Sequence, residues 1–437
     1  MDDLQTGTFG QKPLENTGDM LVLSRSLPCG PFSYTLNTKN KYDETRPPPV
    51  YLNSNDLNKP RKFGLAEVES DFKIRDTGEL KLINESLKEK QKGVISDVLK
   101  KVTTLLLEGK SFVNLSLPIR IFEPRAQSER MCDSLHFFPH YLELAAQNKD
   151  PVERIKLVIT PLFATLHHCL SQLKPFNPLL GETFQGTIGP RTEIYLEHIC
   201  HHPPINAYYI INPLFKIYGK WTFDAKLGAN KFETINHGFM TIEFNDGMKI
   251  KCNLPLAQIN GTLVGDRTFK FIHSFFAYEE QSQTKGVITF SDGKSKNGFF
   301  KNMFGKGGRI DVVSGQVYTY DKAIHDKLLT ESWHSMLKHA SKTADCVTTI
   351  CNISGSWLEE LRFDDKIYWN LARDNNLSHQ QKFATNPLPS DLRFREDLTW
   401  LFYGNEKYAQ QWKLFLEATQ RSNKDKREEF KKLQAKP

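Results

Sequence analysis

The sequence predicts a mainly β protein, in which a many-stranded antiparallel β-body has helices on both sides of it in the chain. The first observation is a long succession of short aromatic and β-branched runs between Phe184 and about Trp357. Gly, Asn, Asp and Pro separate these runs at intervals of about ten residues, which is typical of antiparallel meanders in a sandwich or barrel. The second observation is helical periodicity before and after this region, and a larger barrel of this kind suits an enclosed ligand.

The helices are predicted from apolar residues that recur at a spacing of three or four. Val94, Val98, Val102 and Leu105 follow this spacing, and it stops at Gly109. This helix packs on the core or serves as a lid that contacts a membrane, and the sequence leaves both interpretations open. Further helices are expected over 150–173, over 325–337 and within 391–436.

The domain boundaries follow from these patterns. Residues 1–90 are rich in Asn, Lys, Asp, Gly and Pro and show little apolar periodicity, so we expect a disordered N-terminal extension. The remainder, 91–437, is expected to form one folded domain. It divides into a lid and N-terminal helices over 91–173, a β-barrel over 174–357 and a C-terminal helical region over 358–437.

Composition narrows the class of protein. The 437 residues are 39% hydrophobic and 25% charged, which indicates a soluble globular chain, and the net charge of +7 favours contact with anionic surfaces. No stretch approaches the ~20 apolar residues of a membrane-spanning helix, and the first residues lack a secretory signal. The seven cysteines are scattered without a CxxC pair, so we expect a monomer in the reducing cytoplasm.

Two segments carry most of the chemical information. In the first, 197–204, the adjacent His201 and His202 are followed by two prolines, which fix φ and hold the imidazoles in set directions. In the second, 174–184, two prolines make a loop rigid and Gly181 allows a tight passage into the next strand. Lys174 begins this loop, where a lysine can meet a phosphate as a point charge.

Several segments in a fixed order resemble the lipid-binding domain of oxysterol-binding-protein-related proteins. They are LSLPIRIFEP from Leu115, KPFNPLLGETF from Lys174, EHICHHPP from Glu197, ISGSW ending at Trp357, PLPSDLRFREDL from Pro387 and WKLFLEATQR ending at Arg421. The resemblance covers roughly residues 94 to 430. The family's usual motif reads EQxSHHPP, and here His198 and Cys200 replace Gln and Ser while the histidine pair and the prolines are kept.

The resemblance implies an incomplete β-barrel that encloses one lipid in a tunnel, a flexible N-terminal lid, and a site for the phosphatidylinositol 4-phosphate head group at the tunnel mouth. The head-group residues that it implies are Lys174, Asn177, His201, His202, Lys413, Glu417 and Arg421. Spacing independently places the last three on one helical face, where Glu417 can orient both cations. The alternatives are a solvated, salt-bridged helix face for this trio and turn capping for the histidines.

The resemblance therefore implies a non-enzymatic protein, without cofactor or metal, that exchanges phosphatidylinositol 4-phosphate for sterol or phosphatidylserine between membranes. Its expected partners are these lipids and anionic membrane surfaces, contacted transiently and peripherally, with organelle contact sites as an expected location. No nucleic acid is expected. One alternative is a lipid sensor with little transfer. Another is a metal hydrolase using His198, His201 and His202, but strand alternation would place His201 opposite the other two.

Overall fold

The computed structural model describes residues 52, 56, 69–91, 93–94, 100, 116–170, 173–228, 230–262, 264–293 and 308–434. These residues all belong to one compact unit that spans 49–437. No helix within these ranges is both long and apolar enough to cross a membrane.

The described residues form one sheet of 18 strands and a separate two-stranded pair. The pairings that join the strands of the large sheet are antiparallel. Its strands are β1 (Phe72–Ile74), β2 (Leu80–Leu82), β5 (Thr183–Ile188), β6 (Thr192–His201), β7 (Pro204–Asn212), β8 (Phe215–Leu227), β9 (Lys231–His237), β10 (Met240–Phe244), β11 (Lys249–Cys252), β12 (Leu256–Asn260), β13 (Thr268–Ile272), β14 (Ser274–Glu279), β15 (Thr284–Phe290), β16 (Val312–Tyr320), β17 (Cys346–Ser356), β18 (Glu360–Phe363), β19 (Lys366–Asn370) and β20 (Gln381–Phe383).

The sheet divides at β8, because the two halves of this long strand have different partners. The order β20-β5-β6-β7-β8 leads up to it. The first half of β8 pairs with β10, from which β11, β14, β15, β16, β17, β18 and β19 follow. The second half pairs with β9, followed by β12, β13, β2 and β1. No described pairing joins β19 to β20, so the expected incomplete antiparallel barrel is confirmed.

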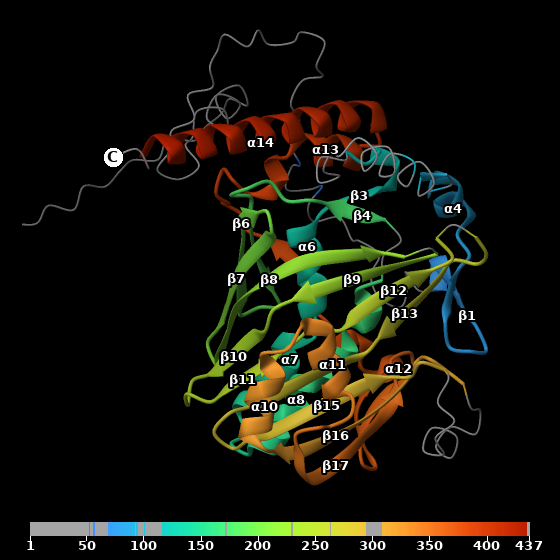
Figure 1. Ribbon diagram of the computed structural model, residues 1–437, viewed down its shortest axis with the longest axis vertical. Helices are drawn as coiled ribbons and strands as arrows, with labels where there is room; N and C mark the ends of the chain where they lie inside the picture. The colour runs from blue at the N-terminus through green and yellow to red at the C-terminus, as the bar shows by residue number, and fades with distance from the viewer. Residues whose placement is uncertain are drawn as a thin grey trace, which may run out of the picture. The chain divides into compact units, whose positions relative to one another are not determined.

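Helices flank the strands at both ends of the described chain. They are α4 (Glu85–Gln91), α6 (Gln127–Met131), α7 (Phe138–Ala146), α8 (Pro151–Ala164), α10 (Lys322–Leu329), α11 (Trp333–Ala340), α12 (Leu371–Asp374), α13 (Glu396–Phe402) and α14 (Glu406–Gln434), with the 3-10 turns η2 (Ile119–Ile121), η3 (Cys132–Leu135), η4 (Leu166–His168), η5 (Asn375–Leu377) and η6 (Leu392–Phe394). The parallel pair β3 (Phe122–Ala126) and β4 (Lys174–Phe176) lies close to α14 (Figure 1).

Helices cover both faces of the sheet around β14 and β15. α8 packs on one face and α11 on the other (Figure 1), and every residue of β14 is buried. Alternate residues of β14 therefore enter two separate apolar clusters: Phe275 packs with the cluster that contains α8, and Phe276 with the cluster that contains α11. A Cβ at Gly286 on β15 would clash with Ile159 of α8, so the close approach of helix and strand requires glycine here.

The structure differs from the sequence-based boundaries at both ends of the sheet. Residues 72–90 were expected in a disordered extension, but they contain β1, β2 and all of α4 except its last residue, and Leu80 and Leu82 are fully buried. Strands of three residues are too short to show a period of two, and β2 is held by pairing with distant β13. The C-terminal region was expected to be helical from residue 358, yet β18, β19 and β20 lie within it.

Only part of the expected lid can be placed. Val94 is helical and 3% exposed, which fits a helix packed on the core. Val98, Val102 and Leu105 lie outside the described residues, as does most of the expected extension over 1–90. The lid interpretation therefore stays a prediction.

Candidate functional site

A cavity of ≈310 Å³ lies beneath α14, at the end of the fold where α14 crosses β6, β3 and β4 (Figure 1). Its wall combines α14, the start of α13, the β3–β4 pair, the end of β6 and the segments at Ser116 and 177–180, which come from distant parts of the chain. The lining residues are Ser116, Phe122, Phe176, residues 177–180 and 199–202, Arg395, Asp397, Lys413, Leu416, Glu417, Gln420, Arg421, Lys424 and Arg427.

The β3–β4 pair places two aromatic rings and a lysine at one side of this cavity. Parallel pairing sets Phe122 beside Lys174 and Ala126 beside Phe176, and the two phenylalanine ring centroids lie 5.0 Å apart. The ammonium of Lys174 lies 5.0 Å from the Phe122 ring centroid, and that of Lys413 lies 5.1 Å from it. Both cations gain from the negative face of this ring.

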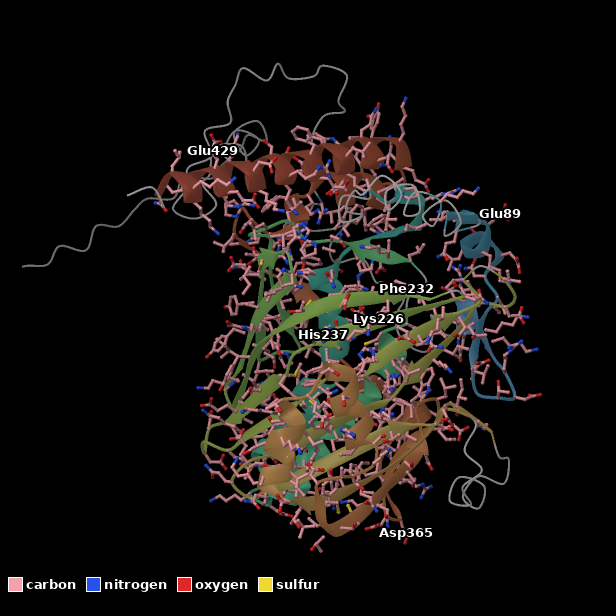
Figure 2. All side chains as sticks on the ribbon, in the orientation of Figure 1. Glu89, Lys226, Phe232, His237, Asp365 and Glu429 are labelled. Atoms are coloured by element: carbon pink, nitrogen blue, oxygen red, sulfur yellow. The ribbon has the colours of Figure 1, made fainter. Side chains whose placement is uncertain are left out.

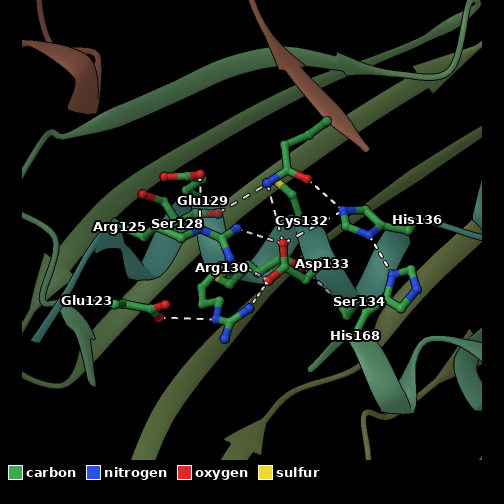
Figure 3. Close-up of polar contacts among 12 residues, drawn as sticks. Glu123, Arg125, Ser128, Glu129, Arg130, Cys132, Asp133, Ser134, His136 and His168 are labelled. Carbon is green, nitrogen blue, oxygen red and sulfur yellow. Dashed lines mark hydrogen bonds and ion pairs between the residues drawn. The ribbon is translucent and has the colours of Figure 1, made fainter. Parts of the chain in front are cut away.

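An ion-pair network in α6 and η3 anchors β3 (Figure 3). Arg125 of β3 donates to both carboxylate oxygens of Asp133, at 2.9 and 2.7 Å, and Arg130 donates to Asp133 at 2.6 Å. These arginines lower the pKa of the buried Asp133 carboxyl, against the effect of its burial. Arg130 also contacts Glu123 at 3.1 Å. The network fixes β3, and therefore the position of Phe122, at the base of the site.

A second buried network fixes the loop after β4. Arg395 donates to Glu182 at 2.9 Å, to Asp397 at 2.9 and 2.8 Å, and to the backbone carbonyl of Asn177 at 2.7 Å. The conformation of Gly181, with φ of 81°, lets its N–H reach the carbonyl of His198 at 2.9 Å. The loop is therefore tied both to the segment before α13 and to β6.

Lys413 and Glu417 of α14 form a donor and acceptor pair inside the cavity. Lys413 is 4% exposed, and its ammonium donates to Glu417 Oε1 at 2.6 Å and to Ser116 Oγ at 2.9 Å. Glu417 Oε2 is buried and has no hydrogen-bond partner among the described residues. A buried acceptor without a donor is costly, so this oxygen marks a place where a ligand hydroxyl can donate.

Lys174 lies within interaction range of this pair. It donates to the side-chain oxygen of Asn177 and to the carbonyl of Pro175, the latter at 3.2 Å. Burial lowers the pKa of Lys174 to about 7, and the nearby charges of Lys413 and Arg395 contribute to this effect. An anion placed here would be attracted by several cations at once.

The two predicted histidines lie at the opposite wall, where β6 turns into β7. A β-bulge shifts the register between His198 and Cys200, so that His198 Nε2 lies 3.0 Å from His201 Nδ1. The expectation that strand alternation separates these two side chains was wrong, because a bulge adds one residue to one strand. Burial, with the positive charges of Arg427 and Lys424, lowers the pKa of His201 to about 4. Burial and Lys424 also lower the pKa of His202.

The mouth of the cavity carries cations from the middle of α14. Arg421, Lys424 and Arg427 follow at helical spacing and all line the cavity. Among the described residues, Lys424 forms an ion pair with the exposed Glu428, at 3.7 Å. Within the described part of the chain, no ion pair or hydrogen bond joins Arg421 or Arg427 to another residue. These positive charges are therefore available to a ligand.

The structure brings together the residues that the sequence analysis selected. Asn177, His201, His202, Lys413, Glu417 and Arg421 line the cavity, and Lys174 contacts Asn177 beside it. Sequence reasoning missed the partners Ser116 and Arg395, because they come from other segments. Lys424 and Arg427 were also missed, although their spacing of three and six residues from Arg421 continues the same helical face.

The comparisons with known proteins agree with this fold. A family model described as oxysterol-binding protein matches residues 102–437. Oxysterol-binding protein 9 of Dictyostelium discoideum is 30% identical over 355 residues, which are 80% of this chain and 79% of that protein. Oxysterol-binding protein-related protein 8 of Mus musculus is 30% identical over 305 residues, 66% of this chain but 30% of that longer protein.

Solved structures with this fold were found as well. The Osh3 ORD from Saccharomyces cerevisiae, in complex with PI(4)P, has a TM-score of 0.56 and 19% identity, covering 75% of this chain and 84% of that chain. The Osh1 ORD in complex with ergosterol has a TM-score of 0.56 and 20% identity, covering 72% of this chain and 77% of that chain. At this identity the likeness concerns the fold, and it agrees with the incomplete antiparallel sheet described above.

Proposed function

This chain belongs to the oxysterol-binding protein family, and from that premise we propose that it binds membrane lipids and carries them between membranes. In this proposal the cavity beneath α14 takes the head group of phosphatidylinositol 4-phosphate. The second cargo is a sterol or phosphatidylserine, and the two lipids are exchanged. The protein acts without a cofactor, as a monomer that contacts anionic membrane surfaces transiently.

The observation that carries the head-group assignment is the arrangement of Lys413 and Glu417. A phosphorylated inositol ring offers hydroxyl donors beside phosphate acceptors. The cavity offers the complementary set: the unpartnered Glu417 Oε2 as acceptor and the Lys413 ammonium as donor. A site with both groups favours such a ring over a simple anion, because each buried polar atom then obtains a partner.

Charge supports the same assignment. Lys413 is neutralised by Glu417, and Arg395 by Asp397 and Glu182. Arg421, Lys424 and Arg427 remain as positive charges around the mouth. A phosphate monoester carries about −1.5 to −2 charge near pH 7, and arginine contacts phosphate with two parallel donors.

The cargo assignment rests on relatives. The solved structure of the Osh3 ORD holds PI(4)P and that of the Osh1 ORD holds ergosterol, and the relatives are named for oxysterol binding. We infer that this chain binds lipids of the same classes. Phosphatidylserine stays an alternative second cargo, to be separated from sterol by experiment.

A metal hydrolase is disfavoured by the hydrogen bonds of His198. Its Nδ1 faces Asn206 Oδ1 at 2.9 Å and its Nε2 faces His201, so neither ring nitrogen is free to bind a metal. In the described ranges, no group of three His, Cys, Asp or Glu residues is placed to hold a metal ion. We therefore favour a carrier over a metal hydrolase at these histidines.

The first test is lipid loading. The purified chain is incubated with liposomes that contain phosphatidylinositol 4-phosphate, sterol and phosphatidylserine, re-isolated, and analysed by mass spectrometry. We expect one lipid per chain, with phosphatidylinositol 4-phosphate displacing the second cargo. Absence of bound lipid under every composition would refute the proposal.

A matched pair of variants assigns the site. Arg421→Ala removes an exposed cation at the mouth, and Lys407→Ala removes an exposed lysine of the same helix that does not line the cavity. We expect Arg421→Ala to weaken extraction of phosphatidylinositol 4-phosphate by tenfold or more, the effect of about one charge-assisted hydrogen bond. Extraction by Lys407→Ala should match that of the unmodified chain.

A transfer assay separates the carrier from the sensor. Donor liposomes with phosphatidylinositol 4-phosphate and acceptor liposomes with the second cargo are mixed with catalytic amounts of protein. A carrier exchanges many lipids per chain, whereas a sensor binds tightly and transfers at most one. Stoichiometric binding without turnover would favour the sensor.

A further inference from the structure

Asn206, His198 and His201 form a hydrogen-bonded chain that ends in the cavity. Asn206 Oδ1 lies 2.9 Å from His198 Nδ1, and His198 Nε2 lies 3.0 Å from His201 Nδ1. Asn206 and His198 are each 1% exposed, whereas His201 lines the cavity. Since Nδ1 of His201 is already occupied, Nε2 is its remaining ring nitrogen for a ligand.

The positions of the protons along this chain follow from its first member. In the orientation of the Asn206 amide that the structure shows, the oxygen faces His198 Nδ1. This oxygen carries no proton, so Nδ1 of His198 donates to it. A neutral His198 then has a lone pair at Nε2, which accepts the Nδ1 proton of His201. A neutral His201 is left with a bare lone pair at Nε2. Such a lone pair repels a phosphate oxygen, which is also an acceptor.

The charged groups around the histidines keep them neutral while the cavity is empty. Lys424 and Arg427 of α14 face His201, with His202 beside it on the same turn. On the other side, Arg395 lies close enough to lower the pKa of His198, together with burial. Each of these neighbours is a cation or can become one, and each opposes protonation of His201.

The carboxylates that line the same cavity do not compensate for these cations. Asp397 is held by Arg395 at 2.8 Å, and Glu417 by Lys413 at 2.6 Å. A phosphate at the mouth would therefore be the first anion in direct contact with His201. Its charge favours the imidazolium form of that ring, which can donate from both nitrogens.

We propose that binding of a phosphate group in this cavity takes up one proton from solvent onto Nε2 of His201, and that His198 is the positioning residue that imposes this uptake. The inference rests on the proposed function and adds a regulation to the same site. The new N–H bond forms at Nε2, the proton comes from water or buffer, and no other covalent bond changes. Loading with phosphoinositide is therefore favoured by acid and release by alkali.

The test counts protons by titration calorimetry with inositol 1,4-bisphosphate, in buffers that differ in ionisation enthalpy. The chain is compared with His198→Gln, in which the amide nitrogen can donate to His201 Nδ1. Neutral His201 then carries its proton on Nε2, where it can donate without protonation. We expect the unmodified chain to take up about one proton more than His198→Gln, because the ligand's own ionisation cancels in this comparison.

The pH profile gives a second readout. Between pH 7 and 5, the ratio of the affinity of the unmodified chain to that of His198→Gln should rise, by at most tenfold per pH unit for one proton. His237→Gln is the matched control: His237 ends β9, away from α14 (Figure 2), does not line the cavity and should leave the profile unchanged.

The outcomes separate the two proposals. Equal proton uptake by the unmodified chain and His198→Gln, with binding intact, would overturn the proton coupling and leave the proposed function standing. Absence of binding to either protein would overturn both. If His198→Gln does not fold, the ¹⁵N shifts of the His201 ring in the unmodified chain provide the test. We expect the Nε2 signal to change from unprotonated to protonated when ligand is added. An unchanged signal would refute the coupling.

Discussion

Lys174 shows how one side chain can tune the site before a ligand arrives. Burial and the charges of Lys413 and Arg395 lower its pKa to about 7, so a sizeable fraction of the ammonium is deprotonated at neutral pH. A bound phosphate favours the charged form and raises this pKa. Ligand binding is therefore coupled to protonation of Lys174, in addition to the coupling proposed for His201.

The first prediction concerns this coupling. The contribution of Lys174 to the affinity for inositol 1,4-bisphosphate should be constant below its pKa of about 7 in the empty site. It should fall as the pH rises above this value, until the pKa of the complex is reached. Lys174→Arg keeps a charge that does not titrate in this range, so its affinity should fall less between pH 7 and 9 than that of the unmodified chain. Calorimetric titrations at several pH values measure both; an equal alkaline decline in the two proteins would contradict the role of Lys174.

Arg395 is the residue whose loss should damage the fold most directly. It is buried and neutralises Glu182 and Asp397. Arg395→Met leaves two carboxylates without their cation, and we predict a loss of about 3–5 kcal/mol in the free energy of unfolding. Urea denaturation measures it.

The control for this variant is another arginine that is exposed. Arg75 contacts Asp266 at 2.6 Å, with both side chains about 40% exposed. Arg75→Met should cost under about 1 kcal/mol, since solvent screens such a pair. Similar losses in the two variants would mean that the Arg395 network contributes little to stability.

At the scale of secondary-structure elements, α14 has two functional parts. One face of the helix lines the cavity between Lys413 and Arg427, whereas Lys431 and Lys432 continue the helix beyond it. Glu429, labelled in Figure 2, lies toward the far end of the helix. The helix therefore offers a comparison between cations at the cavity and cations elsewhere on the same element.

This comparison is the third prediction. Lys424→Ala with Arg427→Ala should weaken binding of inositol 1,4-bisphosphate by tenfold or more and make the affinity less dependent on salt, because two cations near the phosphate are removed. Lys431→Ala with Lys432→Ala changes the net charge equally and should leave affinity within about twofold. Calorimetry at two salt concentrations distinguishes the pairs; equal effects would indicate a general charge effect and not a site.

The sequence predicted α14 better than it predicted the surfaces that face it. A spacing of four placed Lys413 and Glu417 on one face, and the structure joins them at 2.6 Å. The partner Ser116 and the β3–β4 pairing depend on contacts between distant segments, which local periodicity does not contain. The bulge that turns His201 toward His198 was missed because a one-residue register shift leaves no signal in a single sequence.

At the scale of the whole molecule, the same limitation explains what was missed in the sheet. Alternating aromatic and β-branched runs predicted an antiparallel meander, and consecutive strands such as β5, β6, β7 and β8 do pair in order. The pairing of β8 with β10 and the pairing of β2 with β13 join strands that are not neighbours in the chain. Only tertiary packing determines these contacts.

A buried group of histidines links helices, 3-10 turns and the sheet edge. His136 Nδ1 lies 2.7 Å from His168 Nδ1, and His136 Nε2 lies 2.6 Å from Gln381 of β20 (Figure 3). His167 lies 3.3 Å from Asn375. Burial lowers the pKa of all three histidines, that of His167 to about 4. The folded protein therefore holds them neutral.

The last prediction is that this group makes the fold sensitive to acid. The unfolded chain binds protons at histidine below about pH 6.5, whereas folded His167 does so only near pH 4. The contribution of His167 to stability is therefore full above pH 6.5 and falls as the pH drops from 6.5 to 4. His167 alone can account for roughly 3 kcal/mol across this window. Urea denaturation from pH 7.5 to 4.5 should show this decline. His167→Phe keeps an aromatic ring beside Phe137 and Trp369. This variant should reduce the slope of the free energy of unfolding against pH by the equivalent of up to one proton. His237→Phe, at a partly exposed histidine, should leave this slope unchanged. An identical slope in all three proteins would exclude His167 as a source of acid sensitivity.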